Sequence, residues 1–437
     1  MAIILDAKAP GFNAAFEDLV RRARGTVENV SDPVTGIIKD VRANGMDAVC
    51  RLTSQYDGFE ASLERVRVSA DEITAARGRL QSEIITALDN AAIRIKSFHE
   101  KQYPEGLRYK DNAGVELGWR WTPVQAAGLY APGGRAAYPS SVLMNAIPAR
   151  VAGVKRIVMC VPTPGGEDND AVLTAASIAG VDEIWRIGGA QAIAAMAYGA
   201  INRSGNGAVG ISPVDVIVGP GNAFVAEAKR QVFGTVGIDS IAGPSEILVV
   251  ADNDNDPDWI AADLLSQAEH DPSSQAILIT NDQVFANQVR ECVERQIDAS
   301  PRREIMAAAW GDNSAVIIVN SLDDAPSLID RLAPEHLELA TANPDGLLEK
   351  IQNAGAIFLG RYTPEALGDY VAGPNHVLPT SGAARYASGL SVLSFMKRTT
   401  IVRADATSLR EVAADAICLA EVEGLPGHAS SLKRRLN

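Results

Sequence analysis

Histidine is scarce in this chain, and four of its five imidazoles stand in segments whose neighbouring residues could take part in chemistry. The first segment is Gln267-Ala-Glu269-His270, near the end of a helix expected over residues 257–269. Gln267 and His270 are three residues apart, so they share one face of that helix. Imidazole is a common zinc ligand, whereas a side-chain amide is an unusual one. The alternative is a histidine that only interacts favourably with the C-terminus of the helix.

Glu335 and His336 form an adjacent acid–imidazole pair. Pro334 disfavours a helical conformation at Ala333, so the pair is expected at a turn. Two proton acceptors could serve one site if their pKa values are tuned near the working pH. Adjacency does not show that both side chains face the same way, and a surface role is the alternative.

Two further segments combine acids and histidines with glycine and proline. Asp369 and His376 lie in a loop after a predicted strand, and such loops often carry function. Asp369 could equally be a solvated turn residue. Glu423 and His428 lie near the chain end, where glycine and proline should end a helix, and a surface position is the alternative there. His99, on a charged helix, is assigned a structural role.

Three glycine-containing turns, at residues 132–134, 188–191 and 219–224, follow predicted strands and precede predicted helices. Ligands bind at the carboxyl ends of strands in open α/β sheets. The last turn approaches the G-x-G-x-x-G dinucleotide fingerprint, but Phe224 replaces its third glycine, so the fingerprint is incomplete. Each turn alone could be a tight connection, whereas three in one unit strengthen the case for a bound ligand.

Short apolar runs alternate with helical patterns after residue 127, which predicts parallel sheets covered on both faces. The first series of predicted strands spans residues 128–131, 156–161, 182–187 and 215–218. The second series spans residues 246–250, 276–280, 315–319 and 356–359. We therefore expect an α/β fold with two Rossmann-like, doubly wound α/β domains that lack a full glycine fingerprint, plus helical N- and C-terminal segments.

The composition is that of an ordinary globular protein: 437 residues, 47% hydrophobic and 22% charged. The net charge of −14 disfavours a nucleic-acid partner. No apolar stretch reaches the ~18 residues of a membrane span, and the N-terminus lacks the basic start of a signal peptide. Four cysteines without a C-x-x-C pair suggest a reducing compartment, so the expected location is cytoplasmic.

Eight long segments keep one order along nearly the whole chain: GLYAPGGRAAYPSSVLMNAIPARVAGV, RIGGAQAIAAMAYG, VGPGNAFVA, GIDSIAGPSEILVVAD, DWIAADLLSQAEHD, APEHLELA, GDYVAGPNHVLPT and EGLPGHA. Together they resemble the histidinol dehydrogenase family, which catalyses the last steps of histidine biosynthesis. The resemblance covers the segments that contain each candidate residue discussed above except His99.

This resemblance implies a role for each candidate residue. The implied zinc ligands, one ion per subunit, are Gln267, His270, Asp369 and His428. The implied acid–base pair is Glu335 and His336. The substrate is held by the zinc ligands and His336 together with Ser245, His376 and Glu423. The residues implied to contact NAD are Tyr130, Gln191 and Asn222.

The resemblance also implies a homodimer with shared active sites, in which Glu423 and His428 complete the pocket of the other subunit. The expected domains begin with an N-terminal helical arm over residues 1–25. Residues 26–127 plus 241–385 are expected to form the first α/β domain, with the metal and catalytic motifs. Residues 128–240 are expected to form the second, cofactor-binding α/β domain, and residues 386–437 a C-terminal helical segment that reaches the partner subunit.

The implied reaction oxidises L-histidinol to L-histidine through the aldehyde, with two NAD⁺. No cysteine lies in a recognised site motif, so hydration of the aldehyde is expected in place of a thiohemiacetal. Glu335 suits activation of that water and His336 suits removal of the substrate proton. The alternatives are an NAD-dependent dehydrogenase of another polar alcohol, and a zinc-binding hydrolase or non-catalytic metal-binding module. Glu423 and His376 argue for a substrate with an imidazole and an amine.

Overall fold

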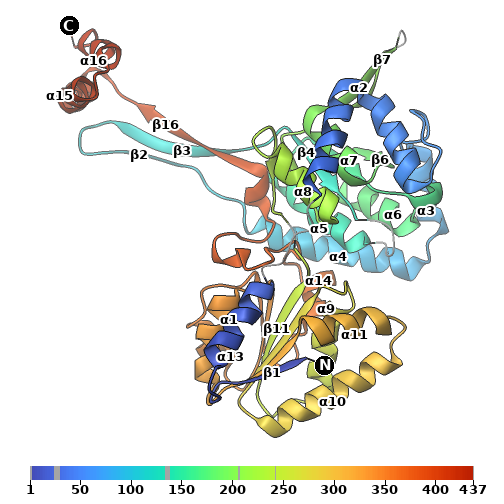
Figure 1. The fold of residues 1–437 in the computed structure, drawn as a ribbon. Helices are drawn as coiled ribbons and strands as arrows, with labels where there is room; N and C mark the ends of the chain where they lie inside the picture. Colours follow the sequence, from blue (N-terminus) through green and yellow to red (C-terminus); the bar gives the residue numbers. More distant parts are fainter. Residues whose placement is uncertain (1, 24–29, 133–137, 205–206, 242, 437) are drawn as a thin grey trace.

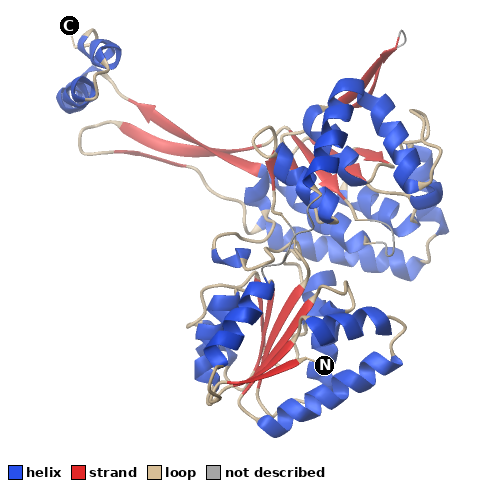
Figure 2. Cartoon of the chain, in the orientation of Figure 1, coloured by secondary structure: helices blue, strands red, loops and turns tan. Residues whose placement is uncertain are grey.

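The protein consists of two α/β units and a projecting arm, as the computed structural model in Figures 1 and 2 shows. The structure describes residues 2–23, 30–132, 138–204, 207–241 and 243–436. Each unit is built around a parallel sheet. The predicted α/β architecture with two Rossmann-like domains is therefore confirmed. None of the described helices has the length and apolar character that crossing a membrane requires.

The upper unit in Figure 1 contains a five-stranded sheet in the order β10-β9-β4-β5-β6. Its strands are β4 (Ala126–Tyr130), β5 (Arg156–Cys160), β6 (Glu183–Trp185), β9 (Val216–Val218) and β10 (Gly237–Ile238). Its helices are α5 (Pro139–Ala152), η1 (Pro164–Gly166), α6 (Asp170–Ala179), α7 (Gly189–Tyr198) and α8 (Ala223–Val232). A hairpin, β7 (Ala200–Ser204) and β8 (Gly207–Ile211), projects from this unit.

The buried residues of β5 explain why this sheet needs helices on both sides. Val158 and Cys160 join one apolar cluster, whereas Ile157 and Met159 join another. Successive side chains of a strand point to opposite faces, so a strand that is apolar throughout must be covered twice.

Helices α2 (Ser31–Asp57), α3 (Ala70–Arg79) and α4 (Ser82–Glu100) also pack on this unit, where α2 contacts α7, α3 contacts α6 and α4 contacts α5. The buried stripe of α2 includes Val34, Val41 and Val49. This packing differs from the predicted grouping of residues 26–127 with residues 241–385. Helical periodicity shows which face of a helix is buried, but not which sheet buries it.

The lower unit contains a six-stranded parallel sheet in the order β1-β13-β12-β11-β14-β15. Its strands are β1 (Ile3–Asp6), β11 (Glu246–Ala251), β12 (Gln275–Thr280), β13 (Ala315–Ile318), β14 (His336–Ala340) and β15 (Ala356–Leu359). Its helices are α1 (Phe12–Ala23), α9 (Pro257–Ala268), α10 (Gln283–Ala299), α11 (Arg303–Asp312), η2 (Leu322–Asp324), α12 (Ala325–Leu332), α13 (Pro344–Leu348) and α14 (Glu365–Tyr370).

The expected helical arm over residues 1–25 therefore begins with a strand. β1 pairs in parallel with β13, and Ile3 lies opposite Ala315. Among the described residues of this segment, only α1, over Phe12–Ala23, is helical. The short apolar run at residues 3–5 extends the sheet by one strand because its backbone groups find partners on β13.

The arm is a three-stranded antiparallel sheet of β2 (Leu107–Lys110), β3 (Glu116–Pro123) and β16 (Met396–Arg403). Two helices, α15 (Ala406–Val422) and α16 (Pro426–Lys433), lie at its far end, away from both sheets (Figure 1). The short helices η3 (Ala383–Arg385) and η4 (Val392–Phe395) precede β16. The C-terminal segment expected to be helical over residues 386–437 thus contains a strand as well.

Candidate active site

A cavity of about 500 Å³ lies between the two α/β units. Residues that follow β9 and β10 line it from the five-stranded sheet, among them Asn222 and Asp239. From the six-stranded sheet, Ser245 precedes β11, and Glu335 and His336 stand at the beginning of β14. The cavity therefore joins the carboxyl edge of one sheet to the amino edge of the other.

The structure brings most of the predicted site residues to this cavity. Those that line it are Asn222, Ser245, Gln267, His270, Glu335, His336, Asp369 and His376. The first and last of them are separated by about a third of the chain in sequence, so only the fold places them together.

The imidazole of His336 is buried, and its two nitrogens have different surroundings. Nδ1 lies 3.0 Å from the backbone carbonyl oxygen of Glu246. A carbonyl oxygen only accepts hydrogen bonds, so Nδ1 carries the proton and Nε2 has the free lone pair. Nε2 lies 3.6 Å from Oε1 of Glu365 and 3.9 Å from Oδ1 of Asp369. Burial lowers the pKa of His336, although the charge of Glu365 opposes the shift.

Glu335 and Glu246 exchange hydrogen bonds across the neighbouring strands β14 and β11. The backbone N–H of Glu246 donates to Oε2 of Glu335 at 3.0 Å, and that of Glu335 donates to Oε2 of Glu246 at 3.3 Å. The backbone N–H of Ser381 donates to the other oxygen of Glu246 at 2.8 Å. Burial raises the pKa of Glu335 well above its usual range and that of Glu246 to about 7. A raised pKa makes a carboxyl group a stronger proton acceptor in its ionised form.

Helix α14 adds two carboxyl groups, Glu365 and Asp369, one helical turn apart. The backbone N–H of Glu365 donates to Oε1 of Glu338 at 2.5 Å, and the Ser266 hydroxyl donates to Oε2 of Glu365 at 3.0 Å. Burial, together with the charge of Glu365, raises the pKa of Asp369 to about 9. Sequence reasoning missed Glu365, although its i, i+4 spacing from Asp369 was a usable signal.

The donor set around α14 has the chemistry of a metal site. His336, Glu365 and Asp369 each offer a ligand atom, and these atoms lie within 4.8 Å of one another. Nε2 of His336 and Oε1 of Glu365 are buried without a hydrogen-bond partner among the described residues. Imidazole and carboxylate ligands fit a divalent cation such as zinc. Of the predicted ligands, Gln267 contacts Glu365 through a side-chain hydrogen bond, and His270 lines the same cavity.

His376 lies beside this group. Its Nδ1 is 3.0 Å from the backbone carbonyl oxygen of Asp369, and its Nε2 is 3.1 Å from the hydroxyl of Ser141 on α5. Burial lowers the pKa of His376 to about 4, so the ring is neutral near pH 7. The ring thus joins the loop after α14 to the five-stranded unit.

Four predicted residues do not line the cavity within one chain: Tyr130, Gln191, Glu423 and His428. Glu423 and His428 are exposed, on or beside the helices α15 and α16 at the end of the arm (Figure 1). His99 is buried in α4, with Nδ1 2.8 Å from the backbone carbonyl oxygen of Ile95, which agrees with a structural role.

The predicted cofactor residues stand at turns of the five-stranded sheet. The hydroxyl of Tyr130 accepts a hydrogen bond from the backbone N–H of Gly189 at 3.1 Å, and Gln191 is buried in α7. The side chain of Asn222 caps α8 by accepting from the N–H groups of Phe224 and Val225. Most of the predicted turn at residues 132–134 lies outside the described residues.

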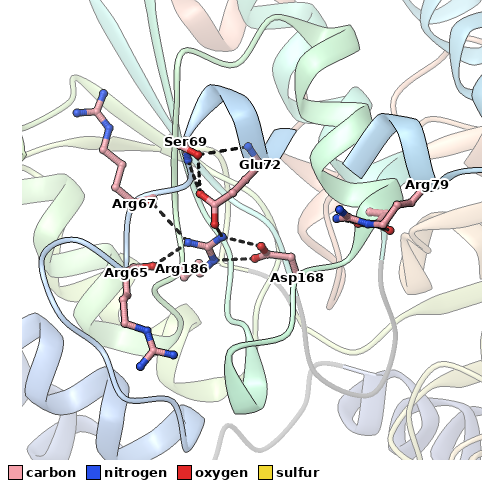
Figure 3. Close-up of polar contacts among 8 residues, drawn as sticks. Arg65, Arg67, Ser69, Glu72, Arg79, Asp168 and Arg186 are labelled. Carbon is pink, nitrogen blue, oxygen red and sulfur yellow. Dashed lines mark hydrogen bonds and ion pairs between the residues drawn. The ribbon is translucent and has the colours of Figure 1, made fainter. Parts of the chain in front are cut away.

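Just before the turn at residues 188–191, a buried arginine forms hydrogen bonds to several segments of the chain (Figure 3). The guanidinium of Arg186 donates to both oxygens of Asp168, to Glu72 at 2.7 Å and to the carbonyl oxygen of Arg65 at 2.7 Å. This network fixes the end of β6, where the glycine turn begins.

Fold and cavity together define a two-domain α/β enzyme with its site between the domains. A family model described as histidinol dehydrogenase matches residues 20–436. The chain is 56% identical to the histidinol dehydrogenase of Rhodospirillum rubrum over 438 aligned positions, which cover 100% of this chain and 99% of that protein. It is 54% identical to the histidinol dehydrogenase of Gluconobacter oxydans, with 99% of both chains covered.

Among solved structures, the histidinol dehydrogenase of Elizabethkingia anophelis matches with a TM-score of 0.93 and 36% identity, covering 100% of this chain and 98% of that one. The chain therefore belongs to the histidinol dehydrogenase family, and its function is that of a dehydrogenase. The family assignment favours a dehydrogenase over the hydrolase or binding module that the sequence left open.

Proposed function

We propose that this protein oxidises L-histidinol to L-histidine through L-histidinaldehyde, with two NAD⁺ and one Zn²⁺ per subunit, in the cytoplasm. The observation that carries the proposal is the buried pair of Glu335 and His336 beside a group of metal-type ligands, in a cavity that also reaches the turn at residues 219–222. The high identity to relatives named histidinol dehydrogenase supports the choice of substrate.

We assign the metal to Gln267, His270 and Asp369, together with His428 of the partner subunit. Glu365 contacts Gln267 and lies close to His336, so it belongs to the same group of donors. When bound, zinc supplies a template that holds the imidazole and amine of the substrate and orients its carbinol carbon. We assign NAD⁺ to Tyr130, Gln191 and Asn222.

The residues of the chain supply the proton transfers. His336 accepts the hydroxyl proton of histidinol at Nε2, while the hydride leaves for NAD⁺ and the aldehyde forms. Glu335 then removes a proton from water that adds to the aldehyde carbon. His336 returns its proton to the aldehyde oxygen, which gives the gem-diol. His336 would then take a hydroxyl proton of the gem-diol while the hydrogen on its carbon leaves as hydride for a second NAD⁺, and the carboxylic acid that forms loses its remaining proton to give the carboxylate. The cavity lining described above contains no cysteine, which agrees with hydration in place of a thiohemiacetal.

We propose that the active unit is a homodimer with shared sites. Glu423 and His428 stand at the end of the arm, where only a second subunit can bring them to a cavity. In the assembled site, Ser245 and His376 and the partner's Glu423 would hold the substrate.

The test is to measure NADH formed per L-histidinol consumed, with and without a strong chelator. We expect two NADH per substrate, loss of activity with the chelator, and recovery on addition of Zn²⁺. A preparation verified to be zinc-free but fully active would contradict the metal assignment. No NADH from histidinol, but NADH from another polar alcohol, would support the alternative substrate on the same scaffold.

A further inference from the structure

A buried ion pair lies beneath the turn at residues 219–222, which the proposed function assigns to NAD⁺. Lys229, on α8, pairs with Asp239, which follows β10. Their side chains are 2% and 5% exposed. Neither residue belongs to the catalytic, metal or cofactor set described above.

The pair holds both peptide groups of Gly219, the first residue of the turn. The ammonium group of Lys229 donates to the carbonyl oxygen of Gly219 at 3.0 Å. The second carboxylate oxygen of Asp239 accepts from the N–H of Gly219 at 2.8 Å. The carboxylate and the ammonium group thus fix the plane of the peptide on each side of one residue.

The turn has little freedom on its other side. Gly219 has a φ of +113°, and a Cβ added there would lie 2.2 Å from the backbone oxygen of Tyr130. The next three residues, Pro220, Gly221 and Asn222, line the cavity, and Asn222 also caps α8. A shift at Gly219 would therefore move the cavity wall and the start of the helix together.

Stability alone is a weak reason for such a pair. Removing two charges from water costs free energy, and a buried ion pair can often be replaced by apolar residues without loss of stability. Hydrogen bonds from the pair to a backbone group do, however, fix a geometry that apolar side chains cannot fix. The pair therefore has a better physical reason in the conformation of the turn than in the stability of the protein.

We propose that Lys229 and Asp239 are positioning residues that hold the Gly219–Asn222 turn in the form that binds the nicotinamide cofactor. The inference rests on the proposed function, because it assumes that this turn contacts NAD⁺. Lys229 does not line the cavity, and both side chains hydrogen-bond to Gly219. Loss of the pair should therefore change cofactor binding more than histidinol binding.

The test compares K229M, D239N and the double variant K229M/D239L with the unaltered enzyme. We expect the KM for NAD⁺ to rise about tenfold or more in each variant, with the KM for histidinol changed less than about twofold. The double variant removes both charges, so its thermal stability should exceed that of either single variant. Its KM for NAD⁺ should nevertheless stay high.

R230M is the matched control, because Arg230 is the next residue on α8 and pairs with Glu227 of the same helix. It should change neither KM. NADH binding, followed by fluorescence, gives a readout that is independent of turnover and of partial unfolding. A double variant with a normal KM for NAD⁺, or equal rises in both KM values, would overturn the proposal. An unaltered enzyme that forms no NADH from histidinol would instead overturn the proposed function.

Discussion

At the scale of single residues, the placement of His336 and Glu335 depends on Glu246. The backbone carbonyl of Glu246 faces Nδ1 of His336, and its carboxylate accepts from the N–H of Glu335. The Glu246 N–H donates in turn to the carboxylate of Glu335. One residue therefore contacts both members of the proposed acid–base pair without lining the cavity itself.

We predict that Glu246→Gln lowers kcat by about tenfold or more, because a misplaced general base loses much of its contribution. An amide can accept hydrogen bonds through only one oxygen, so it cannot serve the N–H groups of both Ser381 and Glu335. Steady-state kinetics and the pH profile of kcat check this prediction. Ser381→Ala is the control, because it keeps the backbone N–H and should leave kcat nearly unchanged. An unaltered kcat and pH profile in Glu246→Gln would count against this role for Glu246.

At the scale of elements, the sequence predicted a turn at Pro334 but not the strand that follows. Ala333 has a φ of +51°, in the left-handed region, and β14 begins at His336. The central residue of this strand, Glu338, is an acid, yet it is buried and accepts a hydrogen bond from the N–H of Glu365. Local pattern cannot show that a second segment, far along the chain, will satisfy a buried acid.

Local sequence pattern also fails to show which distant segments meet in the candidate active site. The candidate residues could be found one by one, and the family resemblance assigned their roles. The reciprocal contact of Glu246 and Glu335 depends on the register of β11 against β14, where Ile247 lies opposite His336. That register forms only on folding, so the sequence did not single out Glu246.

The Arg186 network gives a prediction at this scale. Arg186→Met should destabilise the protein by about 3 kcal/mol, because it leaves the carboxylate of Asp168 without its buried partner. Urea unfolding measures the change. Arg79→Met removes the ion pair of Arg79 with Asp170, which is more exposed to solvent, and should leave the unfolding midpoint nearly unchanged. Equal midpoints for the two variants would contradict the prediction.

At the scale of the whole molecule, the arm is the feature on which the proposed homodimer depends. Its strands β3 and β16 pair over eight residues each, and its helices α15 and α16 contact one another. The apolar residues exposed on α15 and between it and α16 include Leu419, Val422 and Leu425. These features agree with an arm that is covered by a second subunit.

Mixing two inactive variants tests shared sites. In a heterodimer of His336→Asn and His428→Asn subunits, one site contains both changes and the other contains neither. Unfolding and refolding an equal mixture should therefore recover about a quarter of the unaltered activity, since half of the dimers are mixed and each has one intact site. A mixture of His336→Asn with Asp369→Asn should stay inactive, because both residues line the cavity from the same chain. No recovery in the first mixture would contradict the shared site.

The cavity joins the carboxyl edge of one sheet to the amino edge of the other. Under the proposed function, one rigid body holds the hydride acceptor and a second holds the hydride donor. The angle between the two units then sets the distance between the carbon that gives the hydride and the carbon that accepts it, while each ligand keeps its own contacts. Hydride transfer is steeply sensitive to such a gap, since a displacement of about 1 Å can cost a hundredfold in rate. Under the proposed function, a change in the angle between the two units would therefore change turnover without a change in either affinity.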